Sequence, residues 1–216
     1  MLDMFVRVDK FLPYVIPYTK DCPNLVARRA IRDTIIEIAA RCGTTTMSFT
    51  MTSNKDQAEY EVELPHGYSV EYIDSVTFDG TPLKGTNREM LNKLYPGTTW
   101  KELAGSPAYY MHTDSPNLLV IVPAPAESGK EIKCEARFRF TRAAELFPAV
   151  YYDRYAETVA AGALYRITAM TGQNFADITM VAQWSRLYAA GISEIKLDTA
   201  RDYTRDFGHV YFRGFI

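Results

Sequence analysis

Apolar residues recur every three or four positions near both ends of the chain, and every second position in the region between. Near the N-terminus the helical spacing runs through Ala27, Ile31, Ile35, Ile38 and Cys42. The other side carries the charged residues Arg28, Arg29, Arg32, Asp33, Glu37 and Arg41. This pattern predicts an amphipathic helix over Asn24–Cys42 that ends at Gly43.

The segment before this helix, Phe11–Pro17, contains Pro13 and Pro17. Proline disfavours the helical conformation in the residue that precedes it. We therefore expect an extended backbone through this segment.

Alternating apolar and polar residues dominate the middle of the chain. The clearest case is the stretch 132–140, where apolar side chains alternate with lysine, glutamate and arginine. A shorter case runs through 59–64, and the stretches 68–78 and 117–122 also have the composition of strands. A period of two is typical of strands with one buried face. Residues 87–94 predict one or two turns of helix within this region.

Helical spacing returns after Pro148 in two further stretches. The first carries its apolar stripe on Tyr152, Tyr155, Val159, Ala163, Ile167 and Met170. The second, expected over 175–196, carries an inward stripe on Ile178, Val181, Ala182, Trp184, Tyr188, Ile192 and Ile195. The turn residues 171–174 between them predict an antiparallel helical hairpin on which the N-terminal helix packs. The small residues 160–163 predict a close approach by a neighbouring helix.

This order of elements predicts an α+β fold. We expect a helical scaffold, made of the N-terminal helix and the C-terminal helical hairpin, with an inserted antiparallel β-sandwich or barrel-like domain and an extended C-terminal tail. The expected boundaries are 1–43 and 148–197 for the two parts of the scaffold, 44–147 for the β-rich insertion and 198–216 for the tail.

The last sixteen residues are unusually aromatic. Their large apolar side chains are Tyr203, Phe207, Tyr211, Phe212, Phe215 and Ile216. A segment of this kind is poorly suited to remain in water alone. We expect it to dock on another chain, since sixteen extended residues reach about 50 Å. Folding back onto its own domain is the alternative.

Composition narrows the classes of function. The 216 residues carry a formal net charge of -2, which does not suit a nucleic-acid binder that relies on bulk positive charge. No stretch approaches the roughly 20 apolar residues of a membrane span. The three cysteines, Cys22, Cys42 and Cys134, are widely spaced and favour free thiols in a reducing compartment. We find no phosphate loop, zinc motif or nucleophile motif, so we expect no enzyme activity and no cofactor or metal.

Aromatic residues in the β-rich region allow a second class of function. Trp100, Tyr109, Tyr110 and His112 lie near expected loops. Together they would suit a sugar-binding platform on a carbohydrate-binding β-module, whereas loop aromatics that cover a small core are the simpler interpretation. The sequence leaves both open.

An ordered series of local motifs resembles the tailed-phage head-to-tail adaptor proteins. The matching stretches are 12–15 (LPYV), 22–23 (CP), 27–37 (ARRAIRDTIIE), 57–60 (QAEY), 64–65 (LP), 73–80 (IDSVTFDG), 87–97 (NREMLNKLYPG), 105–110 (GSPAYY), 123–125 (PAP) and 151–164 (YYDRYAETVAAGAL). The likeness covers residues 12–196, and the stretch 151–164 is its most specific part. No single motif is diagnostic, so the identification depends on the order of the series.

The resemblance implies a structural virion protein, the head-to-tail adaptor or connector of short-tailed bacteriophages. Such a subunit forms a homo-oligomeric ring, commonly of twelve copies, between the portal protein and the tail nozzle protein. DNA passes through the channel of the ring without sequence-specific binding, and no membrane is involved. The protein would be assembled in the host cytoplasm and reside at the head–tail junction of the virion. Another tail or baseplate component is the alternative within this class.

The resemblance also assigns expected contact residues. The aromatic tail would bind the portal through Tyr203, Phe207, Tyr211, Phe212, Phe215 and Ile216. Contacts between neighbouring subunits are expected at Arg28, Arg32, Tyr151 and Arg154.

Overall fold

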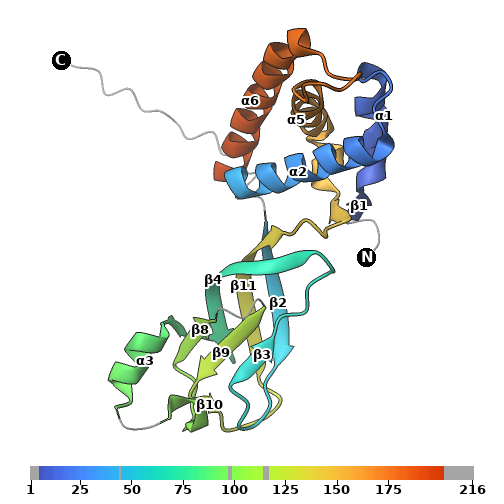
Figure 1. Ribbon diagram of the computed structural model, residues 1–216. Helices are drawn as coiled ribbons and strands as arrows, with labels where there is room; N and C mark the ends of the chain where they lie inside the picture. Colours follow the sequence, from blue (N-terminus) through green and yellow to red (C-terminus); the bar gives the residue numbers. More distant parts are fainter. Residues whose placement is uncertain (1–4, 44, 97–98, 114–116, 202–216) are drawn as a thin grey trace, which may run out of the picture. The chain divides into compact units, whose positions relative to one another are not determined.

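The computed structural model describes residues 5–43, 45–96, 99–113 and 117–201 (Figure 1). The chain divides into two compact units. The helical unit consists of the described residues of Met1–Thr44 and Pro148–Ile216, and the β unit is Thr45–Phe147. The described residues form six α-helices and several antiparallel sheets, which confirms the predicted α+β class.

Most of the helices belong to the helical unit. Its elements are η2 (Val8–Phe11), α1 (Leu12–Val15), η3 (Ile16–Tyr18), α2 (Asn24–Cys42), α4 (Val150–Asp153), α5 (Ala156–Thr168) and α6 (Ile178–Ala200), where η denotes a 3-10 helix, with the short strand β1 (Phe5–Arg7) before them. Helix α5 packs against α1, α2 and α6 (Figure 1). The core of this unit therefore forms around α5.

Helix α2 has the predicted bounds. Its apolar stripe is buried, and Ile31, Ile35 and Ile38 have no exposed surface. Gly43 adopts the left-handed conformation, with φ of 65°, and its N–H donates to the Ala39 carbonyl at 3.0 Å. The helix ends at Gly43 because glycine reaches this conformation without the steric cost of a side chain.

The prediction of an extended backbone through Phe11–Pro17 is wrong. Three short helical elements, η2, α1 and η3, follow one another there. Pro13 and Pro17 each lie in the first turn of an element, where a missing N–H breaks no hydrogen bond. The compact turns bury Phe11 and Val15 completely, which offsets the local preference of the residues before proline.

The stretch after Pro148 also differs from the prediction, because it forms two helices in place of one. Helices α4 and α5 are separated by a turn at Arg154 and Tyr155. Tyr155 is buried at this break, and its hydroxyl donates to Asp198 of α6 at 3.3 Å. The spacing of the apolar stripe continues across the break, so periodicity alone does not reveal it.

Helix α6 begins three residues later than predicted. Asp177 caps it by accepting a hydrogen bond from the Thr179 N–H at 3.1 Å. Tyr188 and Ile192 are buried as predicted, but the inward assignment of Ile178 is wrong, since it is 69% exposed. Ala182 was also expected inward, and it is exposed.

The β unit contains two four-stranded sheets. Its strands are β2 (Thr46–Thr52), β3 (Glu59–Glu61), β4 (Tyr68–Phe78), β5 (Thr81–Pro82), β6 (Lys84–Gly85), β7 (Ala104–Gly105), β8 (Tyr109–His112), β9 (Leu118–Val122), β10 (Ala124–Pro125) and β11 (Glu131–Phe140). Strand β12 (Leu146–Pro148) follows, and the helical turns of this region are α3 (Arg88–Leu94) and η4 (Trp100–Glu102). One sheet has the order β2-β11-β4-β5 and the other β3-β9-β8-β6.

Strands β3 and β11 occur where alternation predicted them, although β3 is shorter than the stretch 59–64. Strands β4 and β9 occur where the composition predicted them, and α3 forms the expected turns. Strands β2 and β8 were not predicted. Most pairs are antiparallel, but the short pairs β6–β8 and β7–β10 are parallel. Apolar residues of both four-stranded sheets, among them Tyr60, Val76, Leu119 and Ile132, meet in one buried cluster.

Candidate interaction surfaces of the helical unit

Helices α2, α5 and α6 meet at Gly162, in the run of small residues of α5. A Cβ atom at this position would lie 2.5 Å from Thr34 Cγ2 of α2 and 2.7 Å from Tyr188 Cε2 of α6. A similar contact occurs where Gly191 of α6 faces Thr158 of α5. The predicted close approach of a neighbouring helix is thus confirmed, and it involves two helices.

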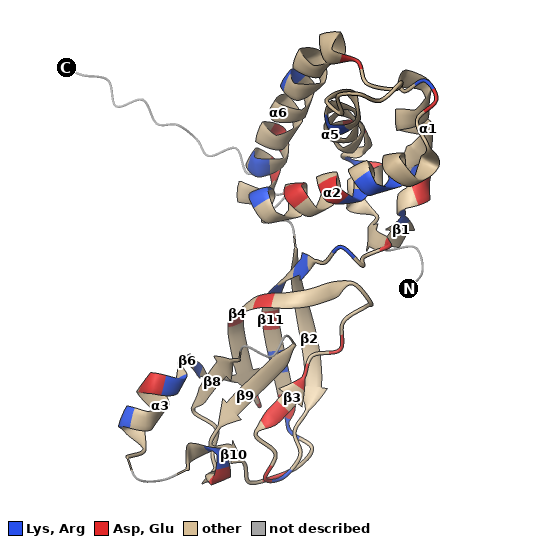
Figure 2. Ribbon diagram, viewed as in Figure 1, with Lys and Arg blue, Asp and Glu red and all other residues tan. Residues whose placement is uncertain are grey.

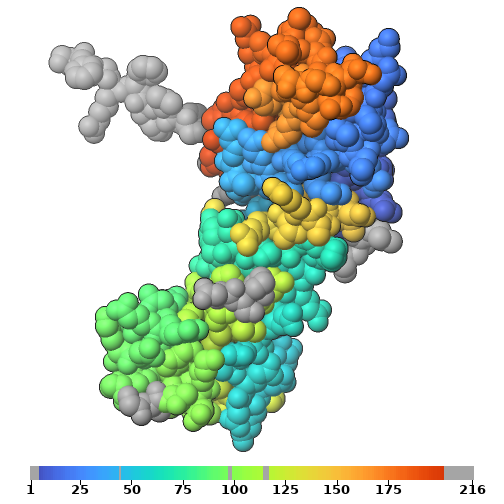
Figure 3. Space-filling view, viewed as in Figure 1, coloured from blue at the N-terminus to red at the C-terminus, as the bar shows by residue number. Residues whose placement is uncertain are grey.

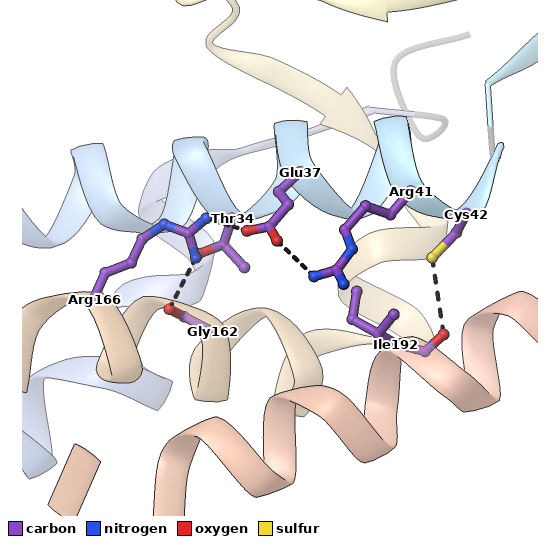
Figure 4. A network of polar contacts seen from close by, with 7 residues as sticks. All are labelled: Thr34, Glu37, Arg41, Cys42, Gly162, Arg166 and Ile192. Carbon is purple, nitrogen blue, oxygen red and sulfur yellow. Dashed lines mark hydrogen bonds and ion pairs between the residues drawn. The ribbon is translucent and has the colours of Figure 1, made fainter. Parts of the chain in front are cut away.

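A polar network joins α2 to α5 beside this contact (Figure 4). The Arg166 guanidinium donates to the Gly162 carbonyl at 3.2 Å and to Thr34 Oγ1 at 3.1 Å, and it also forms an ion pair with Glu37. Arg41 donates to the other carboxylate oxygen of Glu37 at 2.7 Å. The network fixes how α2 and α5 pack, because each charged group has a partner of opposite sign.

This network also determines the protonation of Glu37. Its partial burial alone would raise the pKa of the carboxyl group, but the hydrogen bond and charge of Arg166, with the hydrogen bond from Arg41, bring the pKa below its usual value. Glu37 is therefore held as a carboxylate. The charged groups of Arg41, Glu37 and Arg166 are paired with one another, which is typical of a structural ion-pair network.

Two aromatic pairs join the N-terminal turns of the helical unit to α4 and α6. We call their members the aromatic strip: the exposed Tyr14 and Tyr18, and the partly buried Tyr152 and Trp184. Tyr14 packs edge-on against Tyr152 with ring centroids 6.0 Å apart, and Tyr18 packs against Trp184 at 5.3 Å. Tyr18 remains 63% exposed. Rings with one apolar face and one wet edge are typical of protein–protein contacts.

A groove of about 580 Å³ lies between α2 and α5. It is lined by Val26, Arg29, Ala30, Asp33, Tyr165, Arg166, Ala169 and Met170. Arg29 pairs with Asp33 at 3.8 Å along α2, where acidic and basic residues alternate (Figure 2). A groove lined mainly by apolar atoms and paired charges suits an apolar side chain of a partner better than a reacting substrate.

The outer side of α6 is a third exposed surface. Leu187 is 50% exposed and Leu197 is 56% exposed, and alanines share the rest of this side with polar residues such as Arg186 and Glu194. The helix lies at the surface of the helical unit in the space-filling view (Figure 3). These three surfaces were not predicted, since periodicity does not distinguish a buried apolar residue from an exposed one.

The residues expected at subunit contacts have different environments. Arg28 pairs with Asp9 at 3.0 Å, and its side chain is 35% exposed. Arg32 is partly buried, and Arg154 is exposed. Tyr151 has no exposed surface in the single chain, so its ring supports the unit from within. A direct contact with another subunit is therefore open only to the three arginines.

The predicted tail anchors, Tyr203, Phe207, Tyr211, Phe212, Phe215 and Ile216, lie outside the described residues. Helix α6 leads directly to this segment, since Arg201 forms its C-terminal cap.

The aromatic residues considered for a sugar platform do not share one surface. Trp100 is 7% exposed and packs in a small cluster with Leu91 and Val122, and its Nε1 donates to Asn92 at 2.9 Å. Tyr109 packs on the same cluster, whereas Tyr110 packs against the core between the two sheets. Adjacent residues of a strand point to opposite faces, which separates these rings.

Among the described residues, the candidate metal ligands and the cysteines form neither a metal centre nor a disulfide. Within the described ranges, no group of three or more His, Cys, Asp or Glu side chains is placed to hold a metal ion. The described helices include none that is long and apolar enough to cross a bilayer. The three cysteines are free thiols, and Cys42 and Cys134 are buried.

Comparison with known proteins identifies a matching family model. The family model described as "SU10 adaptor protein" matches residues 2–209, which is nearly the whole chain and includes both units. No curated protein matches the chain.

Proposed function

We infer that this chain, which belongs to the SU10 adaptor protein family, is the head-to-tail adaptor of a bacteriophage virion. The observation that carries this proposal is the family match over residues 2–209. The match includes the residues of the aromatic strip, the α2–α5 groove and the outer side of α6. The surfaces available for partners therefore lie within the region that the family model describes. A structural role agrees with a polar network whose charges are paired with one another.

In this proposal the subunits form a ring, with twelve copies expected, between the portal and the tail nozzle of a short-tailed phage. The ring continues the channel through which DNA passes, without sequence-specific contacts. Contacts that join unlike surfaces close into a ring when the rotation per subunit divides the circle. The helical unit offers unlike surfaces of this kind, namely an apolar groove, an aromatic strip and the outer side of α6.

Contacts between subunits are proposed at Arg28, Arg32 and Arg154, with Tyr151 supporting them from the core. All three side chains reach solvent. Arginine is well suited to such contacts because its planar group forms several hydrogen bonds at once.

Attachment to the portal is proposed to use the aromatic tail, through Tyr203, Phe207, Tyr211, Phe212, Phe215 and Ile216. Large aromatic residues are the most effective anchors at protein interfaces, because they bury much area for few rotatable bonds. The segment begins at the free end of α6, so it can leave the helical unit without disturbing the core.

The experiment mixes purified subunit with purified portal and measures mass by light scattering. One sample is the full chain and another lacks residues 202–216, a deletion that leaves the Arg201 cap of α6 in place. We expect a discrete complex with many subunits per portal for the full chain, and none for the truncated chain.

A matched pair of variants controls for the loss of chain length. Phe207→Ser with Phe212→Ser should weaken the complex strongly, whereas Thr204→Ala should leave it intact. A truncated chain that still binds portal would disprove the tail anchor. The absence of any complex with the full chain would favour another tail or baseplate component.

A further inference from the structure

The outer side of α6 carries exposed apolar residues that no described part of the helical unit covers. Its exposed apolar residues are Ala182, Leu187, Ala189, Ala190, Leu197 and Ala200. Leu187 and Leu197 lie ten residues apart and remain 50% and 56% exposed. The opposite side of α6 packs on α5 and α2 through Tyr188, Ile192 and Ile195. Covering the two leucines would remove apolar surface from water, while the charged residues of the same side stay solvated.

The aromatic C-terminal segment begins where this face ends. Helix α6 stops at Ala200, three residues after Leu197, and fifteen residues follow Arg201. They contain Tyr203, Phe207, Tyr211, Phe212 and Phe215, with Ile216 at the end. Two unfavourable apolar surfaces thus adjoin each other along the chain, and their mutual burial would remove both from water.

The length of the segment suits a return along α6. From Arg201 back to Leu187 the helix rises about 21 Å at 1.5 Å per residue. Fifteen extended residues reach about 50 Å, so a turn of four or five residues still leaves enough chain to pass Leu187. On such a path, four to five residues of extended chain span about 15 Å, the helical separation of Leu187 and Leu197. The spacing from Phe207 to Tyr211 and Phe212 matches it.

Charges on the two partners are compatible with this arrangement. The outer side of α6 carries Arg186, Glu194 and Lys196, and all three are exposed. The segment carries Arg205 and Asp206 immediately before Phe207. A pair of opposite charges on each partner near the C-terminal end of α6 allows ion pairs at the rim of an apolar contact.

We propose that the outer side of α6 is the docking site of the chain's own residues 202–216 in the free subunit. The docked segment covers Leu187 and Leu197 with its aromatic side chains. The docking itself needs no portal. Its consequence for assembly, that portal binding must first release the segment, rests on the proposed function.

The first experiment measures trypsin cleavage at Arg213 in the full chain by mass spectrometry, since Arg213 lies beyond the turn. Cleavage of a docked segment follows its open population, so weaker docking speeds it. Leu187→Ser with Leu197→Ser should accelerate cleavage at Arg213 about tenfold, the change expected from losing two leucine contacts. Leu25→Ser is the matched control, because Leu25 is 78% exposed and lies at the far end of α2 from Cys42, which contacts α6. It should leave the rate unchanged.

The second experiment locates the segment directly. A nitroxide label is attached at His209→Cys in a Cys22→Ser chain, where the remaining cysteines are buried. The methyl NMR signals of Leu187 and Leu197 should broaden, and those of Leu25 should not. Equal cleavage rates in all variants together with unbroadened leucine signals would overturn the proposal. Broadening that arises only between labelled and unlabelled copies in a mixed sample would place the segment on a second chain and overturn it as well.

Discussion

Replacing Gly162 by alanine tests the close packing of α2, α5 and α6. In an open helix this substitution stabilises by about 1 kcal/mol, because glycine loses more backbone freedom on folding. Here the new Cβ would lie 2.5 Å from Thr34 Cγ2, with Tyr188 Cε2 and Cδ2 at 2.7 and 2.8 Å. Both neighbours are buried, and Thr34 is held by hydrogen bonds to Ala30 and Arg166.

Overpacking of this kind costs about 1–3 kcal/mol, and a clash with two helices places it at the upper end. After the gain in helix propensity, we expect a net destabilisation of about 2 kcal/mol. For a chain of this size that lowers the Tm by about 4–8 °C. Circular dichroism at 222 nm during urea and thermal unfolding measures it, since most of the helices belong to the helical unit.

A double-mutant cycle identifies the cause. Thr34→Ser removes Cγ2 but keeps the hydroxyl that accepts from Arg166. In the Gly162→Ala background it should recover about 1 kcal/mol, which is a coupling energy typical of residues in contact. A Tm of Gly162→Ala equal to or above that of the parent chain would refute the packing described here.

Three further predictions concern the acid, thiol and surface residues. Because the pKa of Glu37 is lowered in the folded chain, its stabilisation is present above the unfolded value of about 4.3 and is lost as the pH falls through the lower folded value. Urea titrations from pH 6 to about 3 should show a smaller stability loss for Glu37→Gln than for the parent chain, and equal losses would contradict the network. Iodoacetamide should label the partly exposed Cys22 in the native chain but not Cys134, whose pKa burial raises to about 12, and mass spectrometry that finds equal labelling would argue against the buried position. Arg154→Glu should leave the chain folded, as circular dichroism would show, yet reduce assembly on the portal, as sedimentation would show; unchanged assembly would remove Arg154 from the proposed contact.

Periodicity predicted the elements whose burial follows a single simple face. The stripe of α2 and the alternation of β11 each pack one face inward, and their predicted positions are correct. Strand β2 has the same signal, since Met47, Phe49 and Met51 alternate with exposed threonine and serine. Its inward side chains are only partly buried, because β2 lies at the edge of its sheet, whereas those of β11 are buried between two neighbouring strands.

Tertiary contacts decided the features that the sequence did not predict. Burial of Phe11 and Val15 imposes helical turns on a segment with two prolines. The contact of Tyr155 with Asp198 accompanies a break that an uninterrupted apolar stripe conceals. The exposed leucines of α6 follow the same spacing rules as its buried residues. The sequence alone therefore does not show which apolar residues stay exposed and available to a partner, whereas the structure does.

The composition of a complex between this chain and a portal tests the central claim most directly. Native mass spectrometry of the full chain mixed with a phage portal should give one dominant species, a portal ring carrying a closed ring of adaptor subunits. Separate masses for portal and free subunit, at concentrations where the portal is intact, would contradict the assignment of this chain to the head–tail junction.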